Sequence, residues 1–294
     1  MVNIDSLDLL PSSITSELQR EIKSVMDASA MFYRIFVRRK SKDSAKNKIE
    51  KKGYNETKKM QDLFGVRIVL YFKDDITICR KLLEREFQVI DVTEDIEKET
   101  EFAPTRLNYV CKLPSTIKSQ IDSSFWETVP IDDTFEIQIR TIFSEGWHEV
   151  EHDLRYKCKE DWENENEMSR VLNGIFATLE TCDWSILSLF DKLAYKNYQN
   201  QHWEAMLRNK LRIRMKGNQL DEKIRKVFDN DKDSLKHFFR INREEFVFQL
   251  SSKRISSLPK TIDNIVYISN TMFVHNEKIY SFTPEIIKSK LSLD

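Results

Sequence analysis

Residues 136–141 read Glu-Ile-Gln-Ile-Arg-Thr, and this alternation constrains the fold of the chain more than any other stretch. Successive side chains of a β-strand point to opposite faces, so Glu136, Gln138 and Arg140 are predicted to share one face. Two isoleucines and a threonine then occupy the other face. The pattern predicts a strand whose polar face forms the floor of a site. An ordinary amphipathic strand with a solvated face is the alternative, and the hexapeptide alone does not decide between them.

Other periodic segments predict an α+β domain around this strand. A long helix is expected over residues 12–36, because Ile14, Leu18 and Ile22 recur at four-residue spacing. A basic helix is expected to follow and to end near Gly53. The other elements expected in this domain are strands over 66–72, 107–113 and 135–141 and helices over 75–87 and 144–157. From residue 161 onward the pattern is almost purely helical.

The chain is predicted to divide into four parts: an N-terminal helix (1–32), an α+β domain (33–159), a helical extension (160–235) and a small helical module (236–294). Its net charge of -1 excludes a general attraction to polyanions. The four cysteines show no spacing typical of a metal site. Neither a secretory signal nor a membrane-spanning apolar run is visible, so a soluble, cytoplasmic protein is expected with no membrane partner.

Charged residues near the first strands suggest a phosphate site. Lys40, Ser44 and Lys48 follow one another at four-residue spacing, and Arg38 lies just before them. Cations and a hydroxyl at one helix end suit a polyphosphate, although a solvated helix face is the alternative. Arg67 lies inside an apolar strand, where a charge requires either a buried ion pair or a functional role.

Four co-linear motifs resemble the synthetase domain of the RelA/SpoT family. They are Arg38-x-Lys40-Ser41-x-x-Ser44-x-x-x-Lys48, Asp62-Leu63-x-Gly65-x-Arg67, Glu136-x-Gln138-Ile139-Arg140-Thr141 and Glu151-His152-x-x-x-Tyr156-Lys157. The resemblance implies a nucleotidyltransferase-like mixed sheet flanked by helices, followed here by a helical C-terminal extension. It also implies transfer of pyrophosphate from ATP to the 3′-hydroxyl of a guanine nucleotide, which yields the alarmones ppGpp and pppGpp.

The same resemblance implies a role for each matching residue. Arg38 and Arg67 would stack on the adenine of ATP, since planar guanidinium groups suit that contact. Asp62 would bind Mg²⁺, and Glu136 would complete the metal site or accept the proton of the attacking hydroxyl. The triphosphate would be held by Lys40, Ser44 and Lys48. The other implied contacts are Gln138 and Arg140 beside the carboxylates and His152, Tyr156 and Lys157 on a closing helix.

The acceptor half of the pattern departs from the family. The family carries a Gly-Tyr-x-Ser-x-His segment whose tyrosine stacks on guanine, whereas residues 103–108 here read Ala-Pro-Thr-Arg-Leu-Asn. Arg106 stands in place of the serine and Asn108 in place of the histidine. The candidate acceptor loop therefore comprises Thr105, Arg106, Asn108 and Tyr109.

Two alternatives to alarmone synthesis follow from these departures. The first is a toxic relative that pyrophosphorylates the 3′ end of tRNA in phage defence. A basic stripe would serve it by contacting RNA phosphates, although we favour an exposed charged helix end for these residues: Arg208, Lys210, Arg212, Arg214 and Lys216. The second is a catalytically dead module that binds nucleotide or RNA, and the presence of both Asp62 and Glu136 speaks against it. A regulatory protein partner or a homo-oligomer is a further expectation.

Overall fold

The computed structural model describes residues 4–94 and 107–291, and the chain forms two compact units. Unit 1 comprises Met1–Ser24, Tyr33–Tyr71 and Leu83–Thr181. Unit 2 comprises Val25–Phe32, Phe72–Leu82 and Cys182–Asp294. The domain boundaries expected at residues 32, 159 and 235 stay predictions.

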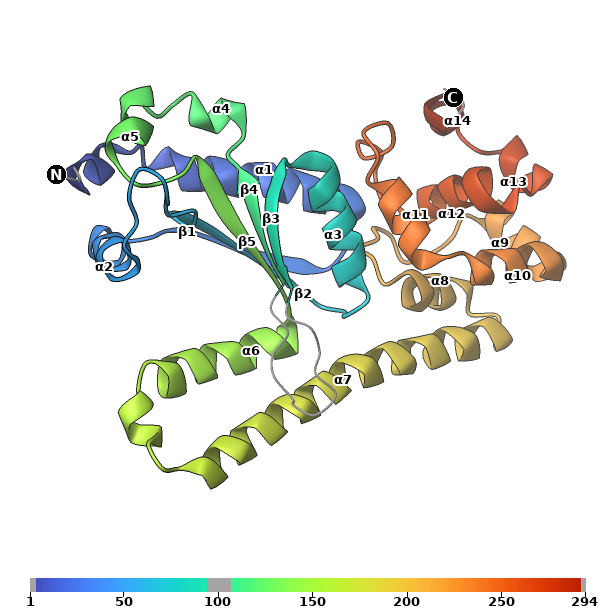
Figure 1. The fold of residues 1–294 in the computed structure, drawn as a ribbon. Coiled ribbons are helices and arrows are strands. Elements are labelled where there is room, and N and C mark those ends of the chain that lie inside the picture. Colours follow the sequence, from blue (N-terminus) through green and yellow to red (C-terminus); the bar gives the residue numbers. More distant parts are fainter. Residues whose placement is uncertain (1–3, 95–106, 292–294) are drawn as a thin grey trace. The chain divides into compact units, whose positions relative to one another are not determined.

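Unit 1 is built on a five-stranded sheet in the order β1-β2-β5-β4-β3 (Figure 1). Its strands are β1 (Tyr33–Arg39), β2 (Phe64–Leu70), β3 (Val89–Glu94), β4 (Leu107–Lys112) and β5 (Thr134–Thr141). The central pair β2 and β5 is parallel, and the other neighbouring pairs are antiparallel. The α+β class and the mixed sheet with flanking helices are therefore confirmed.

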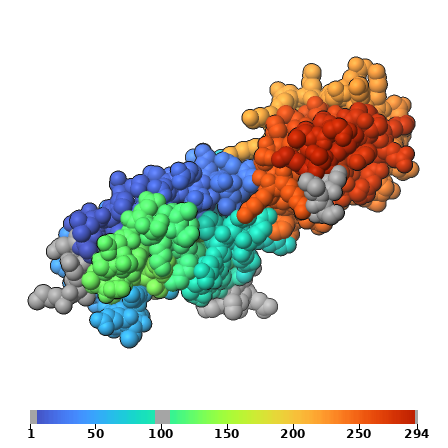
Figure 2. Space-filling view, turned by 90° about the horizontal axis from the view of Figure 1, so that it is seen from above, coloured from blue at the N-terminus to red at the C-terminus, as the bar shows by residue number. Residues whose placement is uncertain are grey.

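Helices flank this sheet and continue past it. They are η1 (Ile4–Leu9), α1 (Ser13–Ser29), α2 (Lys42–Lys52), α3 (Asp75–Glu86), α4 (Ser115–Lys118), α5 (Ser123–Thr128), α6 (Ile142–Glu151), the π-helical turn η2 (His152–Tyr156), η3 (Lys159–Trp162) and α7 (Asn166–Gln199). The turn after α4 contacts α1 through a hydrogen bond from Gln120 Nε2 to Glu17 Oε2 at 2.5 Å. Figure 2 shows the green α4–α5 segment against the blue α1. Within the described ranges, no helix is both long and apolar enough to span a bilayer.

The alternation predicted for residues 136–141 is confirmed in β5. Ile137 and Ile139 are buried in the core of unit 1, together with Ile14, Leu18 and Ile22 of α1. Glu136 and Gln138 are half-buried on the other face. Because the apolar face is covered by packed side chains, the register of β5 is fixed and its polar residues are held toward α6.

Two strands, β1 and β3, were not predicted, and β2 begins and ends two residues earlier than expected. The first helix ends at Ser29 rather than continuing to Phe36, because Ala30 adopts a positive φ of 58° and residues 33–39 form β1. The apolar residues around Met31 extend the helical period, whereas Tyr33, Ile35 and Val37 alternate as a strand requires. The edge strand β3 was not predicted, since it is exposed over most of its length and shows little apolar alternation.

Unit 2 is helical, which confirms the helical C-terminal extension. Its remaining elements are α8 (Trp203–Leu211), α9 (Glu222–Asn230), α10 (Lys232–Arg240), α11 (Arg243–Leu250), α12 (Ile262–Ser269), the π-helical turn η4 (Asn270–Val274), α13 (Glu277–Ser281) and α14 (Glu285–Leu291). These helices appear from orange to red in Figure 1.

A buried ion-pair cluster joins segments of unit 2 that are distant in sequence. Arg243 Nη2 lies 2.6 Å from Asp75 Oδ1, and Arg212 Nη2 lies 2.5 Å from Asp74 Oδ2. Burial is the main reason that the pKa of Asp75 rises to about 6, despite the charge of Arg243. Because Arg212 is buried in this cluster, the basic stripe expected over residues 208–216 is not a continuous exposed surface.

Candidate active site

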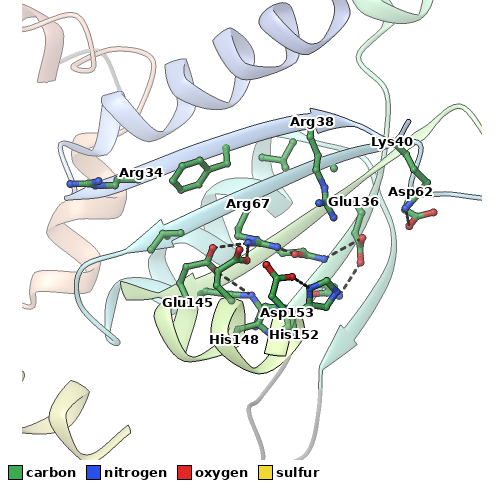
Figure 3. A pocket seen from close by; sticks show the side chains of 18 of the residues that line it. Arg34, Arg38, Lys40, Asp62, Arg67, Glu136, Glu145, His148, His152 and Asp153 are labelled. Atoms are coloured by element: carbon green, nitrogen blue, oxygen red, sulfur yellow. Dashed lines mark hydrogen bonds and ion pairs between the residues drawn. The ribbon is translucent and has the colours of Figure 1, made fainter. Parts of the chain in front are cut away.

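A pocket of about 1080 Å³ opens over the polar face of the sheet in unit 1 (Figure 3). Strands β1, β2, β4 and β5 form its floor, and α6 with the turn η2 forms one wall. Eleven of the predicted site residues line it: Arg38, Lys40, Ser44, Asp62, Arg67, Asn108, Glu136, Gln138, Arg140, His152 and Lys157. Residues from four separate motifs therefore meet in one place.

Strand register explains how these residues come together. Gly65 of β2 pairs with Arg38 of β1 on one side and with Glu136 of β5 on the other. Arg67 pairs with Gln138, and Gln138 in turn pairs with Asn108 of β4. Since directly paired residues share a face, two rows of polar side chains cross the sheet. The Arg38 side chain lies over Gly65, since its Cγ would be 3.9 Å from a Cβ at this position, an ordinary van der Waals contact.

Asp62 lies just before β2 and is held by two cations. Its Oδ2 accepts a 2.6 Å hydrogen bond from Lys48 Nζ, and Lys40 Nζ lies 3.2 Å from the same atom. Burial opposes ionisation of the carboxyl, but these two lysines outweigh it and hold the pKa of Asp62 below its ordinary value. Its other oxygen, Oδ1, is buried and has no hydrogen-bond partner within the described residues. Asp62 is therefore an anion with one oxygen left for a ligand.

Glu136 is the second carboxylate of the pocket. Asn108 Nδ2 donates a 2.9 Å hydrogen bond to its Oε1, and Gln138 Nε2 lies 3.5 Å from its Oε2. Burial, and next the negative charge of Asp62, raise the pKa of Glu136. A raised pKa makes a carboxylate a better proton acceptor near neutral pH.

Arg67 is held in place by side chains from β5 and α6. Its Nε donates to Gln138 Oε1 at 3.3 Å and its Nη1 to Glu145 Oε1 at 2.7 Å, and it also pairs with Glu149. Burial opposes its charge, but the two glutamates outweigh burial and raise its pKa. Glu145 also lies 3.5 Å from Arg140 Nε, so one carboxylate fixes both arginines. Figure 3 shows Arg67 and Glu145 beside one another in the pocket.

The start of α2 supplies hydroxyl groups to the pocket. Ser41 is the N-cap of this helix, and its side chain accepts the backbone N–H of Ser44. The Ser41 hydroxyl also donates to Ser44 Oγ at 2.8 Å. Lys40 precedes the helix rather than lying on its face. The helix ends at Gly53, as predicted, and this glycine adopts the left-handed conformation. Hydroxyls, lysines and unpaired N–H groups at a helix start can bind phosphate oxygens.

The carboxylates of Asp62 and Glu136 fit a hard divalent cation. Such an ion takes oxygen ligands, and Mg²⁺ is commonly bound by one or two carboxylates together with substrate phosphates. Asp62 Oδ1 is the buried oxygen that such an ion would satisfy. No group of three or more His, Cys, Asp or Glu side chains in the described part of the chain forms a metal site by itself.

Some predicted residues lie elsewhere. Tyr109 is fully buried on the core face of β4, where alternation places it opposite to Asn108, so the prediction that it contacts the acceptor is wrong. Tyr156 is exposed beyond the pocket lining and stacks on His152 with ring centroids 5.7 Å apart. Lys48 reaches the site through its ion pair with Asp62. Thr105 and Arg106 fall outside the described residues.

The lining residues that were not predicted include five with charged, imidazole or aromatic side chains: Arg34, Phe36, Glu145, His148 and Glu149. The first two were assigned to a helix, which concealed their alternation with the core residues of β1. The other three lie at positions i, i+3 and i+4 of α6, a spacing that places them on one face. Burial and the charges of Arg140 and Arg67 lower the pKa of His148 to about 4, so the residue is neutral at pH 7.

Comparison with known proteins agrees with the motifs. Residues 37–161 match the family model described as a region found in RelA / SpoT proteins. The GTP pyrophosphokinase YjbM of Bacillus subtilis is 32% identical over 106 residues, which cover 35% of this chain and 46% of that protein. The GTP pyrophosphokinase YwaC of the same organism is 28% identical over 129 residues, which cover 42% of this chain and 57% of that protein. The chain thus spans about half the length of these relatives.

Solved structures with a similar arrangement include the small alarmone synthetase 1 of Bacillus subtilis bound to its product pppGpp. It is 23% identical, with a TM-score of 0.48, over 60% of this chain and 90% of that one. The small alarmone synthetase 2 of the same organism is 21% identical, with a TM-score of 0.49, over 60% of this chain and 92% of that one. Residues 37–161 of the chain match the region found in RelA and SpoT proteins, in agreement with the resemblance of the four motifs.

Proposed function

We propose that the protein is an ATP-dependent pyrophosphokinase that transfers pyrophosphate to the 3′-hydroxyl of a guanine nucleotide. The observation that carries this proposal is the meeting of Asp62 and Glu136 in one pocket beside Lys40 and Lys48. The match to the RelA/SpoT region over residues 37–161 and the two GTP pyrophosphokinases that resemble the chain support it. We further propose that it acts in the cytoplasm.

The reaction requires a nucleophile, a leaving group and a proton acceptor. The 3′-oxygen of the acceptor forms a bond to the β-phosphorus of ATP, the bond from that phosphorus to the oxygen bridging the α-phosphate breaks, and AMP leaves. Glu136 would accept the hydroxyl proton, since burial and Asp62 raise its pKa. Asn108 and Gln138 would hold the carboxylate in position, and no covalent intermediate with the protein is needed.

The donor triphosphate would bind where the cations gather. Lys40, Lys48 and the Ser44 hydroxyl would contact its oxygens, and Arg38 and Arg67 would contact its base. Asp62 and Glu136 would hold Mg²⁺, which when bound would neutralise charge that develops on the phosphates. Lys40 and Lys48, which now neutralise Asp62, would be available to the phosphates once a cation takes their place beside it.

Free guanine nucleotide is the acceptor that we favour over tRNA. A tRNA acceptor would need an extended cationic surface, and the burial of Arg212 interrupts the stripe that suggested one. A dead nucleotide-binding module would not need two carboxylates with interacting charges, and Glu136 and Asp62 interact in this way.

The decisive experiment incubates purified protein with γ-labelled ATP and Mg²⁺ and offers GDP, GTP or deacylated tRNA as the acceptor. We expect label in the guanine nucleotide and unlabelled AMP as the second product. Glu136→Gln should abolish transfer, because it removes the proton acceptor and a negative charge. Glu127→Gln, an exposed glutamate of α5, is the matched control and should transfer at the normal rate. The proposal would be refuted if label were transferred to tRNA alone or to no acceptor. Undiminished transfer by Glu136→Gln would also refute it.

A further inference from the structure

Phe36 is a large apolar side chain that lines the pocket and yet is 55% exposed. It pairs directly with Arg67 in the antiparallel ladder between β1 and β2. Arg34 and Arg38 lie two residues away on either side, so the three side chains share the pocket face of β1. The other face of the strand packs through Tyr33, which is buried, and through Ile35 and Val37, which are half-buried, so the exposed ring of Phe36 is not part of the core.

The surroundings of Phe36 suit a flat ring rather than another chain. The Arg67 guanidinium donates hydrogen bonds to Gln138 and Glu145, and such bonds lie in the guanidinium plane. Its two flat faces therefore stay available for stacking. An aromatic ring beside a guanidinium face is the arrangement that binds a nucleobase, and base–aromatic stacking contributes about 1–3 kcal/mol by alanine substitution.

Charge varies along the pocket in the way that a nucleotide requires. Near Phe36 the charge of Arg67 is balanced by Glu145 and Glu149. Arg34 and Arg38 flank the ring with planar guanidinium groups that can themselves stack on a base. Lys40 lies four residues farther along the chain, which is about 13 Å in an extended strand, and beyond it begins α2 with its serine hydroxyls. Figure 3 shows Arg34, Arg38 and Lys40 in that order along the pocket, with Asp62 at the Lys40 end. A ligand with a flat, uncharged group at one end and phosphates at the other therefore fits both the Phe36 end and the Lys40 end of the pocket.

We propose that Phe36 is a stacking surface for the purine base of the donor nucleotide and a determinant of its affinity. The identity of that nucleotide as ATP rests on the proposed function. Since stacking recognises any flat base, Phe36 would strengthen binding of the nucleoside part and leave binding of the phosphates unaffected.

Isothermal titration calorimetry on the full chain in Mg²⁺ tests this, with ATP and inorganic tripolyphosphate as the two titrants. Phe36→Ala should raise the Kd for ATP about tenfold or more, the ratio that stacking of this strength corresponds to, and leave the Kd for tripolyphosphate unchanged. Phe36→Tyr, which keeps the ring, should bind ATP as the wild type does. Ile90→Ala removes an exposed apolar side chain from β3 outside the pocket and serves as the matched control. Equal thermal midpoints of the variants would show that all of them are folded.

The outcomes separate this inference from the proposed function. The stacking role would be overturned if Phe36→Ala bound ATP with an unchanged Kd, or if its affinity fell equally for ATP and for tripolyphosphate. Neither result would contradict pyrophosphate transfer by the wild type. A loss of affinity for ATP alone in Phe36→Ala would support the stacking role even if the wild type transferred no pyrophosphate. If Phe36→Ala does not fold, the Phe36→Trp variant tests the stacking role instead. Addition of ATP should quench the fluorescence of the introduced tryptophan by stacking, and addition of tripolyphosphate should leave it unchanged. A wild type that does not bind ATP would refute both proposals.

Discussion

Replacing Asn108 by alanine removes the hydrogen bond that its Nδ2 donates to Glu136 Oε1 at 2.9 Å. The carboxylate then keeps only the longer 3.5 Å contact with Gln138 and the more distant charges of Lys48 and Lys40. Because Asn108 lies on β4 and Glu136 on β5, the substitution leaves both strands in register and alters one contact. The carboxylate should become less fixed and easier to protonate.

The geometry sets the size of the effect. A hydrogen bond to an ionised group contributes about 1.5–3 kcal/mol, and the half-buried position of both residues favours the lower end of that range. A loss of about 1.5 kcal/mol in the transition state lowers kcat about tenfold. The same loss disfavours the ionised form of Glu136, whose pKa is already raised by burial and by Asp62, and so raises that pKa further.

The assay is the pH dependence of kcat for pyrophosphate transfer to the guanine nucleotide. A proton acceptor must be ionised, so activity should fall as the pH is lowered through the pKa of Glu136. In Asn108→Ala this acidic limb should move to higher pH, whereas Gln120→Ala, which removes an exposed amide near α4, should not move it. A variant that keeps the wild-type kcat and the wild-type acidic limb would refute the positioning of Glu136 by Asn108.

Other expectations concern the metal, the phosphates and the stability of unit 2. Asp62→Asn should weaken Mg²⁺ binding in calorimetry and lower transfer about a hundredfold or more, since it removes a charged oxygen ligand; normal Mg²⁺ affinity would contradict this. Lys48→Ala should weaken ATP and tripolyphosphate binding alike, about tenfold, and a loss confined to ATP would contradict its contact with phosphate. The rise in the pKa of Asp75 from 3.8 to about 6 corresponds to about 3 kcal/mol of unfolding free energy, present below pH 4 and lost as the pH rises through 6. Denaturation at several pH values should therefore show wild type losing stability relative to Asp75→Asn between about pH 4 and pH 7, and a constant difference would contradict the raised pKa.

Much of the donor side of the site was predictable from local sequence. The strand alternation placed Glu136 and Gln138 on one face, and the basic helix was predicted to end near Gly53, which is the C-cap of α2. These features depend on neighbouring residues only, because period and caps are local properties of the chain. Phe36 was missed for the same reason, since the apolar residues before β1 continue the helical period of α1.

The partners of each charged residue depended on the tertiary structure. Arg67 was predicted to need a compensating charge, but α6 brings Glu145 and Glu149 to it from about eighty positions along the chain. The burial of Tyr109 and the contact of Asn108 with Glu136 likewise follow from the pairing of β4 with β5. The sequence by itself indicated most of the candidate residues that line the pocket and the two faces of β5. Only the sheet order and the packing of α6 decided which of them meet, because those contacts join segments whose separation no local pattern records.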